Sequence, residues 1–169
     1  MIKPRETSPE IKINLVNDTL WELSEQSPEN FSLILFYRGK HCPICKKQLE
    51  ELQKKLSKFI ERGVNVIAIS TDTEDVAKAT YNEWDIADIP LGYGLSIEEA
   101  RDWGLFISKG IKDSEPEYFT EPGLFLLAPD QTIYWESIQS MPFGRPSFND
   151  LLGGIDYILK EDYPARGEA

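Results

Sequence analysis

The only two cysteines of the chain, Cys42 and Cys45, lie three positions apart at a predicted strand-to-helix junction. Pro43 suits the first position of a helix, where a missing N–H costs nothing, so that Cys42 becomes the N-cap residue and Cys45 falls in the first turn. The positive end of a helix stabilises a thiolate, and in such places cysteine pKa values fall to roughly 3.5–7.5. The spacing therefore predicts redox chemistry by a pair of thiols.

Three other interpretations of the cysteine pair remain open. Zinc needs about four ligands, and this chain has no third cysteine and a single histidine, His41, directly beside Cys42. A purely structural disulfide would close a very short loop and constrain the unfolded chain little. The third alternative is two unrelated buried cysteines. Redox activity is the interpretation that we favour, without a metal or cofactor.

Basic residues surround the thiols although the chain as a whole is acidic, with a net charge of −11 over 169 residues. That net charge disfavours nucleic acid as a partner, because phosphates would be repelled. Arg38, Lys40, Lys46 and Lys47 lie close enough in the sequence to stabilise a thiolate or attract an anionic partner. His41 either stabilises the thiolate as a cation or simply covers it.

Length and composition indicate one ordinary domain over residues 1–169, with a core at about 11–160 and a mobile tail at 161–169. The apolar runs are far shorter than the roughly 20 residues that span a bilayer. The sequence opens without the basic and apolar pattern of a secretory signal, so we expect a cytoplasmic protein. In a reducing cytoplasm, a Cys-x-x-Cys pair is more often catalytic than structural.

Hydrophobic patterns predict the elements that position the thiols. Residues 32–37 and 64–69 are almost continuous apolar runs, typical of strands covered on both faces. A helix between them is predicted to end at Gly63. Its inward positions at helical spacing are Leu49, Leu52, Leu56, Phe59 and Ile60.

The remaining elements follow from local signals. We expect hairpins at 11–23 and at 124–135, a short strand within 86–91, and a loop or lid over 108–118. Thr71 with Glu74, and Ser96 with Glu99, have the spacing of capping boxes that open helices. Ser147 is predicted to open the last helix, whose inward residues would be Leu151, Leu152, Ile155, Ile158 and Leu159, and whose Gly153-Gly154 pair suggests close packing. This order predicts an α/β sandwich with the thiols at the carboxyl end of a central strand, where open α/β sheets bind ligands.

The chain resembles the peroxiredoxin-like group of the thioredoxin-fold superfamily, the alkyl hydroperoxide reductase/thiol-specific antioxidant proteins, from about residue 11 to 163. The likeness rests on Phe36-Tyr37, on the helix opened by Cys42-Pro43-Ile44-Cys45, on Ser70-Thr71-Asp72 and on the apolar segment 123–130. It implies a thioredoxin-like three-layer α/β/α sandwich with an N-terminal β-hairpin extension.

The family motif Pro-x-x-x-Thr/Ser-x-x-Cys places the peroxidatic cysteine at Cys45, the hydroxyl residue at Cys42 and the proline at Arg38. The family's active-site arginine falls on Pro122. Arg145 is the alternative arginine that the sequence offers, although a surface arginine is the simpler interpretation of it.

Compared with thioredoxins, Cys42-x-x-Cys45 matches the dithiol motif, and Glu121-Pro122 lies where thioredoxin-fold proteins carry a cis-proline that faces the thiols. A cis bond there would leave the backbone before Pro122 free to pair with an extended substrate. Glu121 would then be an acid near the dithiol, able to accept a proton in place of the buried carboxylate that thioredoxins use and that residues 32–37 lack.

We therefore predict a thiol–disulfide oxidoreductase or antioxidant protein in which Cys42 attacks and Cys45 resolves the mixed disulfide. A dedicated peroxidase with Cys45 as the attacking residue, and a redox-sensing or interaction protein without catalysis, are the alternatives. The resemblance implies a thiol reductant (thioredoxin or a low-molecular-weight thiol), a hydroperoxide or protein disulfide as substrate, and is compatible with a homodimer.

Overall fold

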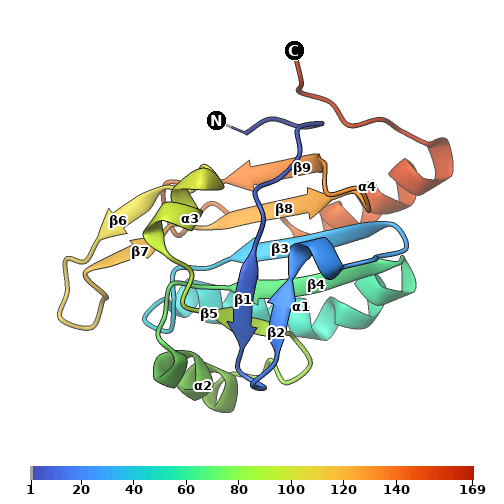
Figure 1. Ribbon diagram of the computed structural model, residues 1–169. Helices are drawn as coiled ribbons and strands as arrows, with labels where there is room; N and C mark the ends of the chain where they lie inside the picture. Colours follow the sequence, from blue (N-terminus) through green and yellow to red (C-terminus); the bar gives the residue numbers. More distant parts are fainter. Residues whose placement is uncertain (1) are drawn as a thin grey trace.

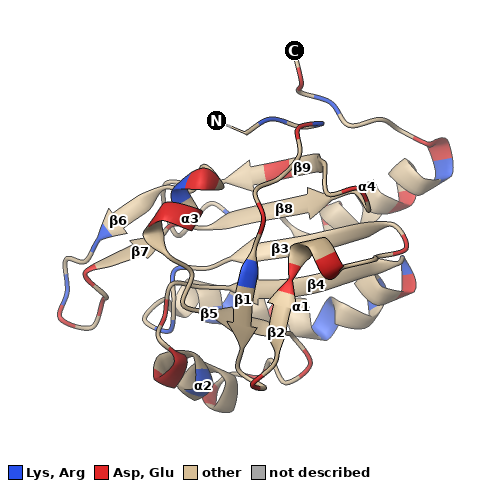
Figure 2. Ribbon diagram, in the orientation of Figure 1, with Lys and Arg blue, Asp and Glu red and all other residues tan. Residues whose placement is uncertain are grey.

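A central strand of six buried residues, β3 (Phe31–Phe36), organises the fold. The computed structural model describes residues 2–169. In it β3 pairs in parallel with β4 (Val64–Ile69) and antiparallel with β8 (Gly123–Leu127). None of these three strands carries a charged residue, and in Figure 2 all three are tan along their length. The continuous apolar runs therefore form the centre of the sheet, as predicted.

The sheet has seven strands in the order β2-β1-β5-β4-β3-β8-β9, and a separate two-stranded ribbon pairs β6 with β7 (Figure 1). The other strands are β1 (Lys12–Leu15), β2 (Leu20–Glu22), β5 (Leu91–Tyr93), β6 (Ile107–Lys109), β7 (Tyr118–Thr120) and β9 (Ile133–Ile138). The helices are α1 (Pro43–Glu61), α2 (Glu74–Glu83), α3 (Ile97–Asp102) and α4 (Phe148–Glu161), with a short 3-10 turn, η1, at Leu23–Glu25. Both predicted hairpins are present, as β1–β2 and β8–β9.

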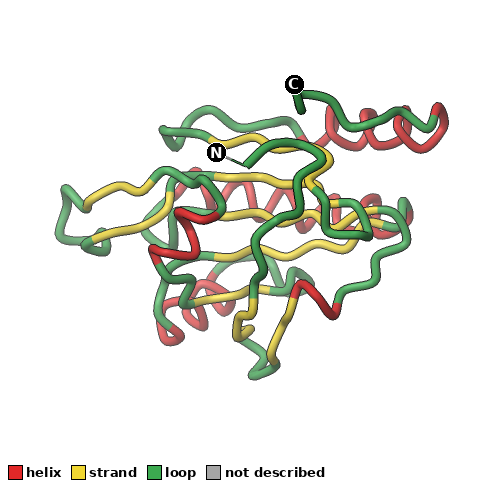
Figure 3. Tube along the Cα trace, turned by 45° about the horizontal axis from the view of Figure 1, so that its top comes forward, coloured by secondary structure: helices red, strands yellow, loops and turns green. Residues whose placement is uncertain are grey.

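Helices cover both faces of the sheet, which makes the fold a three-layer α/β sandwich. Figures 1 and 3 show α1 and α4 behind the sheet, whereas α3 lies on the opposite side. Alternate residues of β3 point to the two faces: Leu33 and Leu35 pack with α1 and α4, and Ile34 and Phe36 pack with Trp103. The two cores meet at β3, so the end of this strand is held firmly from both sides.

Helix α1 begins and ends as the sequence predicts. Cys42 is its N-cap, Pro43 is its first residue, and Gly63 follows its end with a positive φ of 69°. One predicted inward residue is wrong: Ile60 is 60% exposed, because it lies one position past Phe59 and turns away from the sheet.

Helix α4 begins after its predicted cap, Ser147, but packs less closely than expected. Leu159 is 42% exposed rather than inward. The interpretation of Gly153-Gly154 as a close-packing pair is also wrong, since a Cβ at either glycine would meet no atom within 4 Å.

Two predicted boundaries move because backbone pairing extends past the end of β4. Thr73, not Thr71, caps α2, and its Oγ accepts a hydrogen bond from Val76 N. Asp72 O accepts from Gly94 N at 2.8 Å, so the chain is still extended where Thr71 would have begun the helix. The expected strand within 86–91 starts only at Leu91, as β5. The capping box of Ser96 and Glu99 is present as predicted.

The segment 108–118, expected to be a loop or lid, is largely an ordered ribbon. Strands β6 and β7 pair antiparallel, with Ser108 opposite Phe119. The polar composition of the segment hid this structure, because a two-stranded ribbon outside the main sheet needs few apolar residues. Its turn, residues 110–117, lies near the carboxyl end of β3.

Both ends of the described chain lie near β9 (Figure 1). Arg5 Nε donates a hydrogen bond to Ala165 O at 3.0 Å, and Tyr134 donates to Tyr163 O at 2.6 Å. Residues beyond α4 therefore contact the N-terminal segment and β9. Within residues 2–169, none of the helices has the length and apolar character needed to cross a bilayer.

Candidate active site

Cys42 and Cys45 lie at the start of α1, just beyond the carboxyl end of β3. Both thiols are free and buried, with exposures of 1% and 0%. The Cys42 Sγ accepts a hydrogen bond from Cys45 N at 3.2 Å, which is the bond of a helix N-cap. The two sulfurs are thus held together in the geometry that the spacing predicts, although Cys42 is scarcely more exposed than Cys45.

The surroundings of the two thiols drive their pKa values apart. The pKa of Cys42 is lowered to about 6. The hydrogen bonds from the Cys45 thiol and the Cys45 backbone N–H lower it, as do the guanidinium groups of Arg38 and Arg145, and together they outweigh the effect of burial. Burial, followed by the neighbouring Cys42, raises the pKa of Cys45. At neutral pH, Cys42 is therefore the thiolate and Cys45 the thiol that donates to it.

Arg145 contacts both sulfurs. Its Nη2 lies 3.3 Å from Cys45 Sγ and 3.8 Å from Cys42 Sγ. Its Nε donates to Pro142 O at 2.6 Å, so the loop that leads into α4 holds the guanidinium in place. The interpretation of Arg145 as a surface arginine is wrong, because loop 139–147 folds back over the start of α1.

Gln48 completes this arrangement and was missed by sequence reasoning. Its side chain is 8% exposed, and its Oε1 accepts a hydrogen bond from Arg145 Nη1. The signal was present in the spacing, since positions i and i+3 of a helix share a face, which places Gln48 on the face of Cys45. A buried polar residue on that face needs a partner, and the partner is Arg145.

Arg38 and Glu121 form an ion pair close to the dithiol. Arg38 Nε lies 3.1 Å from Glu121 Oε2, and the other Glu121 oxygen accepts from Ser108 at 2.7 Å. Glu121 is 4% exposed, and Arg38 lies over the Phe119 ring, 4.8 Å from its centroid. Ribbon β6–β7 thus supplies the groups that hold Arg38 on the side of Cys42.

His41 covers the site as a neutral side chain. Burial and the positive charge of Arg38 lower the pKa of His41, so the ring is uncharged at neutral pH. The ring packs against Phe119 with 4.6 Å between centroids. Of the two roles expected for His41, the lowered pKa and the contact with Phe119 favour covering.

Comparison with known protein families matches residues 4–136 to the AhpC/TSA family. The chain belongs to the AhpC/TSA family. The resemblance inferred from the residues around the thiols is thereby confirmed.

The relatives within the AhpC/TSA family include several proteins named alkyl hydroperoxide reductase C. The one from Staphylococcus saprophyticus is 36% identical over 130 residues, covering 76% of this chain and 66% of the relative. The one from Helicobacter pylori is 23% identical over 164 residues, covering 94% and 78%. The chain spans between 59% and 66% of the length of the staphylococcal relatives it matches.

Solved structures of related proteins share the fold at low sequence identity. AhpC of Enterococcus faecalis has a TM-score of 0.77 and 17% identity, with 98% of this chain and 99% of that chain covered. The reduced 2-Cys peroxiredoxin of Plasmodium vivax has a TM-score of 0.76 and 18% identity, with 94% and 83% covered. The thioredoxin-like fold expected from the sequence is confirmed.

The predicted cis-proline is wrong for this AhpC/TSA member, because no cis peptide bond occurs between residues 2 and 169. The backbone around Pro122 is also not free for a substrate. Glu121 N donates to Phe106 O at 2.8 Å, and Pro122 O accepts from Gln139 N at 2.9 Å. These bonds tie the segment to the residue before β6 and the residue after β9, where a thioredoxin-like site would leave it open.

Metal ligands are not gathered at this AhpC/TSA site. Within residues 2–169, no group of three or more His, Cys, Asp or Glu side chains could hold a metal ion. The donors around the two sulfurs are guanidinium and amide groups, which suit a thiolate and an oxygen-bearing substrate rather than a cation.

The thiolate of Cys42 should be visible in a titration. Because its pKa is lowered to about 6, the far-ultraviolet absorbance of thiolate should rise as the pH increases through 6, below the ordinary range of about 8.5. The measurement is the difference in absorbance between the reduced protein and its Cys42→Ser variant. A midpoint near 8.5 would contradict this assignment and would favour a protein without thiol catalysis.

Proposed function

We propose that this AhpC/TSA protein is a thiol-dependent oxidoreductase that uses the Cys42–Cys45 pair to reduce hydroperoxides or disulfides. The observation that carries the proposal is the pairing of a Cys42 thiolate with a Cys45 thiol under one guanidinium, with Arg145 Nη2 within 3.8 Å of both sulfurs. A nucleophile, a resolving thiol and a cationic group for a developing negative charge are thereby within reach of one another.

With a hydroperoxide, the Cys42 thiolate attacks the terminal oxygen, and the O–O bond breaks. The leaving alkoxide takes a proton and departs as an alcohol, and Cys42 becomes a sulfenic acid. The Cys45 sulfur then attacks the Cys42 sulfur and expels hydroxide, which leaves as water with the Cys45 proton. The net result is one hydroperoxide reduced and one Cys42–Cys45 disulfide formed.

With a disulfide substrate, the same thiolate attacks one sulfur and releases the other as a thiol. Cys45 resolves the resulting mixed disulfide and returns the same oxidised pair. The Cys-x-x-Cys spacing favours this reaction, whereas the names of the family relatives favour the hydroperoxide.

A second arrangement has Cys45 as the attacking cysteine and Cys42 as its resolving partner. Two observations favour it: the family motif aligns its peroxidatic cysteine with Cys45, and Arg145 Nη2 is closer to the Cys45 sulfur, at 3.3 Å. The raised pKa of the Cys45 thiol opposes it. We therefore assign attack to Cys42.

The neighbouring residues support this chemistry in different ways. We assign to Arg145 the orientation of the reacting oxygen or sulfur, in place of the arginine that the family carries where Pro122 stands. Arg38 stabilises the Cys42 thiolate, and Glu121 positions Arg38. We do not assign proton acceptance to Glu121, because one of its oxygens forms an ion pair with Arg38 and the other accepts a hydrogen bond from Ser108.

The partners that we propose are a thiol reductant, either thioredoxin or a low-molecular-weight thiol, and a hydroperoxide or protein disulfide. A dithiol that must be re-reduced after each turnover suits the cytoplasm. We further propose that residues 1–169 act as one domain and that the chain forms a homodimer, as the family resemblance implies.

The proposal is tested by mixing the reduced protein rapidly with hydrogen peroxide, an alkyl hydroperoxide or a small disulfide. We expect intrinsic tryptophan fluorescence to change within a second for at least one of them, because Trp84 packs with Tyr37 in the same cluster as the thiols. Mass spectrometry should find an intramolecular Cys42–Cys45 disulfide. Oxidation that takes minutes with every substrate would eliminate catalysis and leave a redox sensor or interaction protein.

A further inference from the structure

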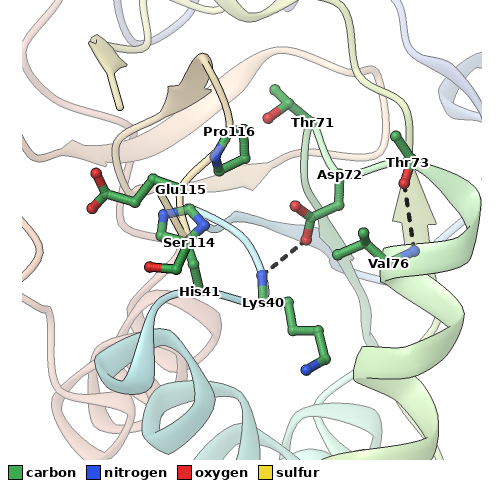
Figure 4. A pocket seen from close by; sticks show the side chains of 9 residues that line it. All are labelled: Lys40, His41, Thr71, Asp72, Thr73, Val76, Ser114, Glu115 and Pro116. Atoms are coloured by element: carbon green, nitrogen blue, oxygen red, sulfur yellow. Dashed lines mark hydrogen bonds between the residues drawn. The ribbon is translucent and has the colours of Figure 1, made fainter. Parts of the chain in front are cut away.

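A pocket of about 540 Å³ lies beside the turn that leads into Cys42. Three loops line it: Lys40 and His41 before α1, Thr71–Thr73 after β4, and residues 114–116 in the turn of the β6–β7 ribbon (Figure 4). Its size falls in the range of about 300–1,000 Å³ that is usual for small-molecule sites. It lies at the carboxyl ends of the parallel strands β3 and β4, where such sheets bind ligands.

Two polar atoms of the pocket residues are buried without a partner. Within residues 2–169, neither His41 Nε2 nor Thr71 Oγ1 has a hydrogen bond. Leaving a buried polar group without a partner is costly, so native structures rarely keep one without a reason. Both atoms belong to residues that line the pocket.

The charges of the pocket favour a cationic group. Asp72, which is 4% exposed, and the half-buried Glu115 are its two carboxylates. The single lysine, Lys40, has its Nζ 2.8 Å from Glu83 and is thus already neutralised. Burial raises the pKa of Asp72, so an ammonium group nearby would also relieve the cost of its charge.

The pocket is coupled to Cys42 through a single tight turn. Gly39 has φ +133°, and a Cβ there would lie 2.7 Å from Asp72 Oδ1, so only glycine fits. Lys40 N donates to Asp72 Oδ2 at 2.9 Å, and Cys42 N donates to Gly39 O at 3.1 Å. In Figure 4 the Asp72 carboxylate points toward the His41 side of the pocket. A ligand held there lies against the residues that immediately precede Cys42.

We propose that this pocket binds the ammonium group of a low-molecular-weight aminothiol that reduces the oxidised Cys42–Cys45 pair. This inference rests on the proposed function. The ligand thiolate attacks Cys42 Sγ, the Cys42–Cys45 bond breaks, and Cys45 takes up a proton. A second thiol then attacks the ligand sulfur of the mixed disulfide, which frees Cys42 and releases the oxidised ligand disulfide. Two aminothiols are oxidised, and one protein disulfide is reduced.

Binding can be measured without any redox reaction. Ethanolamine carries the ammonium group but no thiol, and His41 is the only histidine of the chain, so its imidazole NMR signals report on the pocket alone. We expect saturable shifts of these signals with ethanolamine and none with ethylene glycol. The Asp72→Asn variant, which keeps an oxygen to accept from Lys40 N, should lose most of the response.

Reduction is tested on protein whose Cys42–Cys45 disulfide has been formed chemically. The reductants are cysteamine, with a positive group, 2-mercaptoethanol, with a neutral group, and mercaptoacetate, with a negative group. The rate at which each thiol reduces the protein disulfide is divided by its rate with a small model disulfide. Cysteamine should be favoured over the neutral thiol by roughly three- to tenfold, and mercaptoacetate disfavoured. Because all three release the same Cys45 thiol, effects on that leaving group cancel.

Variants assign this preference to the pocket. Glu115→Gln keeps the acceptor for Ile111 N and Lys112 N, and Asp72→Asn keeps the acceptor for Lys40 N. Both should reduce the preference for cysteamine toward one. Asp75→Asn removes an exposed carboxylate of α2 that does not line the pocket, and should leave the preference unchanged.

Each outcome decides between the alternatives. The aminothiol site is overturned if the three thiols have equal normalised rates, or if ethanolamine does not shift the His41 signals. Either result decides against the site even if the dithiol turns over hydroperoxide. Reduction by a protein thiol alone also overturns it. If neither hydroperoxide nor disulfide oxidises the purified protein, the proposed function fails. The ethanolamine titration still tests binding to the pocket in that case, because it needs no redox reaction.

Discussion

Replacing Cys42 by serine should reduce the turnover of hydroperoxide or disulfide by at least about a thousandfold, because the thiolate is the attacking group and a neutral hydroxyl is a far weaker nucleophile. Cys45→Ser should behave differently. It keeps the attacking sulfur and should consume about one equivalent of substrate before it stops. The measurement is rapid-mixing kinetics of both variants beside the wild-type protein.

The trapped species identifies the attacking cysteine. In Cys45→Ser, treated with hydroperoxide, a sulfenic acid at Cys42 should react with dimedone, and mass spectrometry should place the adduct on Cys42. The same treatment of Cys42→Ser should give almost no adduct. An adduct on Cys45 in Cys42→Ser, formed at the wild-type rate, would instead assign the attack to Cys45, as the family motif aligns it.

The parts of the fold that local patterns determine could be predicted from the sequence. The buried strands at 31–36 and 64–69 follow from continuous apolar runs, and the cap at Cys42 follows from Pro43 and the helical spacing after it. Thr71 was mistaken for a helix cap because its spacing to Glu74 is the same with or without a continuing strand. Only the pairing of Asp72 O with Gly94 N, 22 residues away, decides the matter.

The site was less predictable, because its polar groups come from distant segments. Arg145 contacts two sulfurs that lie 100 or more residues earlier in the chain. No local sequence pattern predicts that loop 139–147 crosses the start of α1. The expected cis-proline failed for a related reason. The ribbon that occupies the backbone of Glu121 was hidden in a polar segment, so Pro122 was assigned the open position that it has in thioredoxins.

Replacing Arg145 by methionine should raise the pKa of Cys42 and slow its attack on hydroperoxide by about ten- to a hundredfold. The guanidinium is one of the groups that lower this pKa, and a rise of one unit corresponds to about 1.4 kcal/mol. The larger part of the rate loss should persist at pH values where the thiolate is fully formed, since Arg145 also orients the reacting atom. The measurements are the thiolate titration and the second-order rate constant across pH.

Two further variants separate charge from geometry. Lys47→Met removes a positive charge from the pocket that Arg145 also lines and should change neither quantity by more than about twofold, because its charge is exposed and screened. Arg145→Lys keeps the charge but loses the planar fork that serves Gln48 and both sulfurs at once, so it should recover part of the pKa shift and little of the rate. If the Arg145→Met variant reacts with hydroperoxide at the wild-type rate, the guanidinium only anchors loop 139–147 to α1. Orientation of the reacting atom would then be assigned to Arg38, the other guanidinium that lowers the pKa of Cys42.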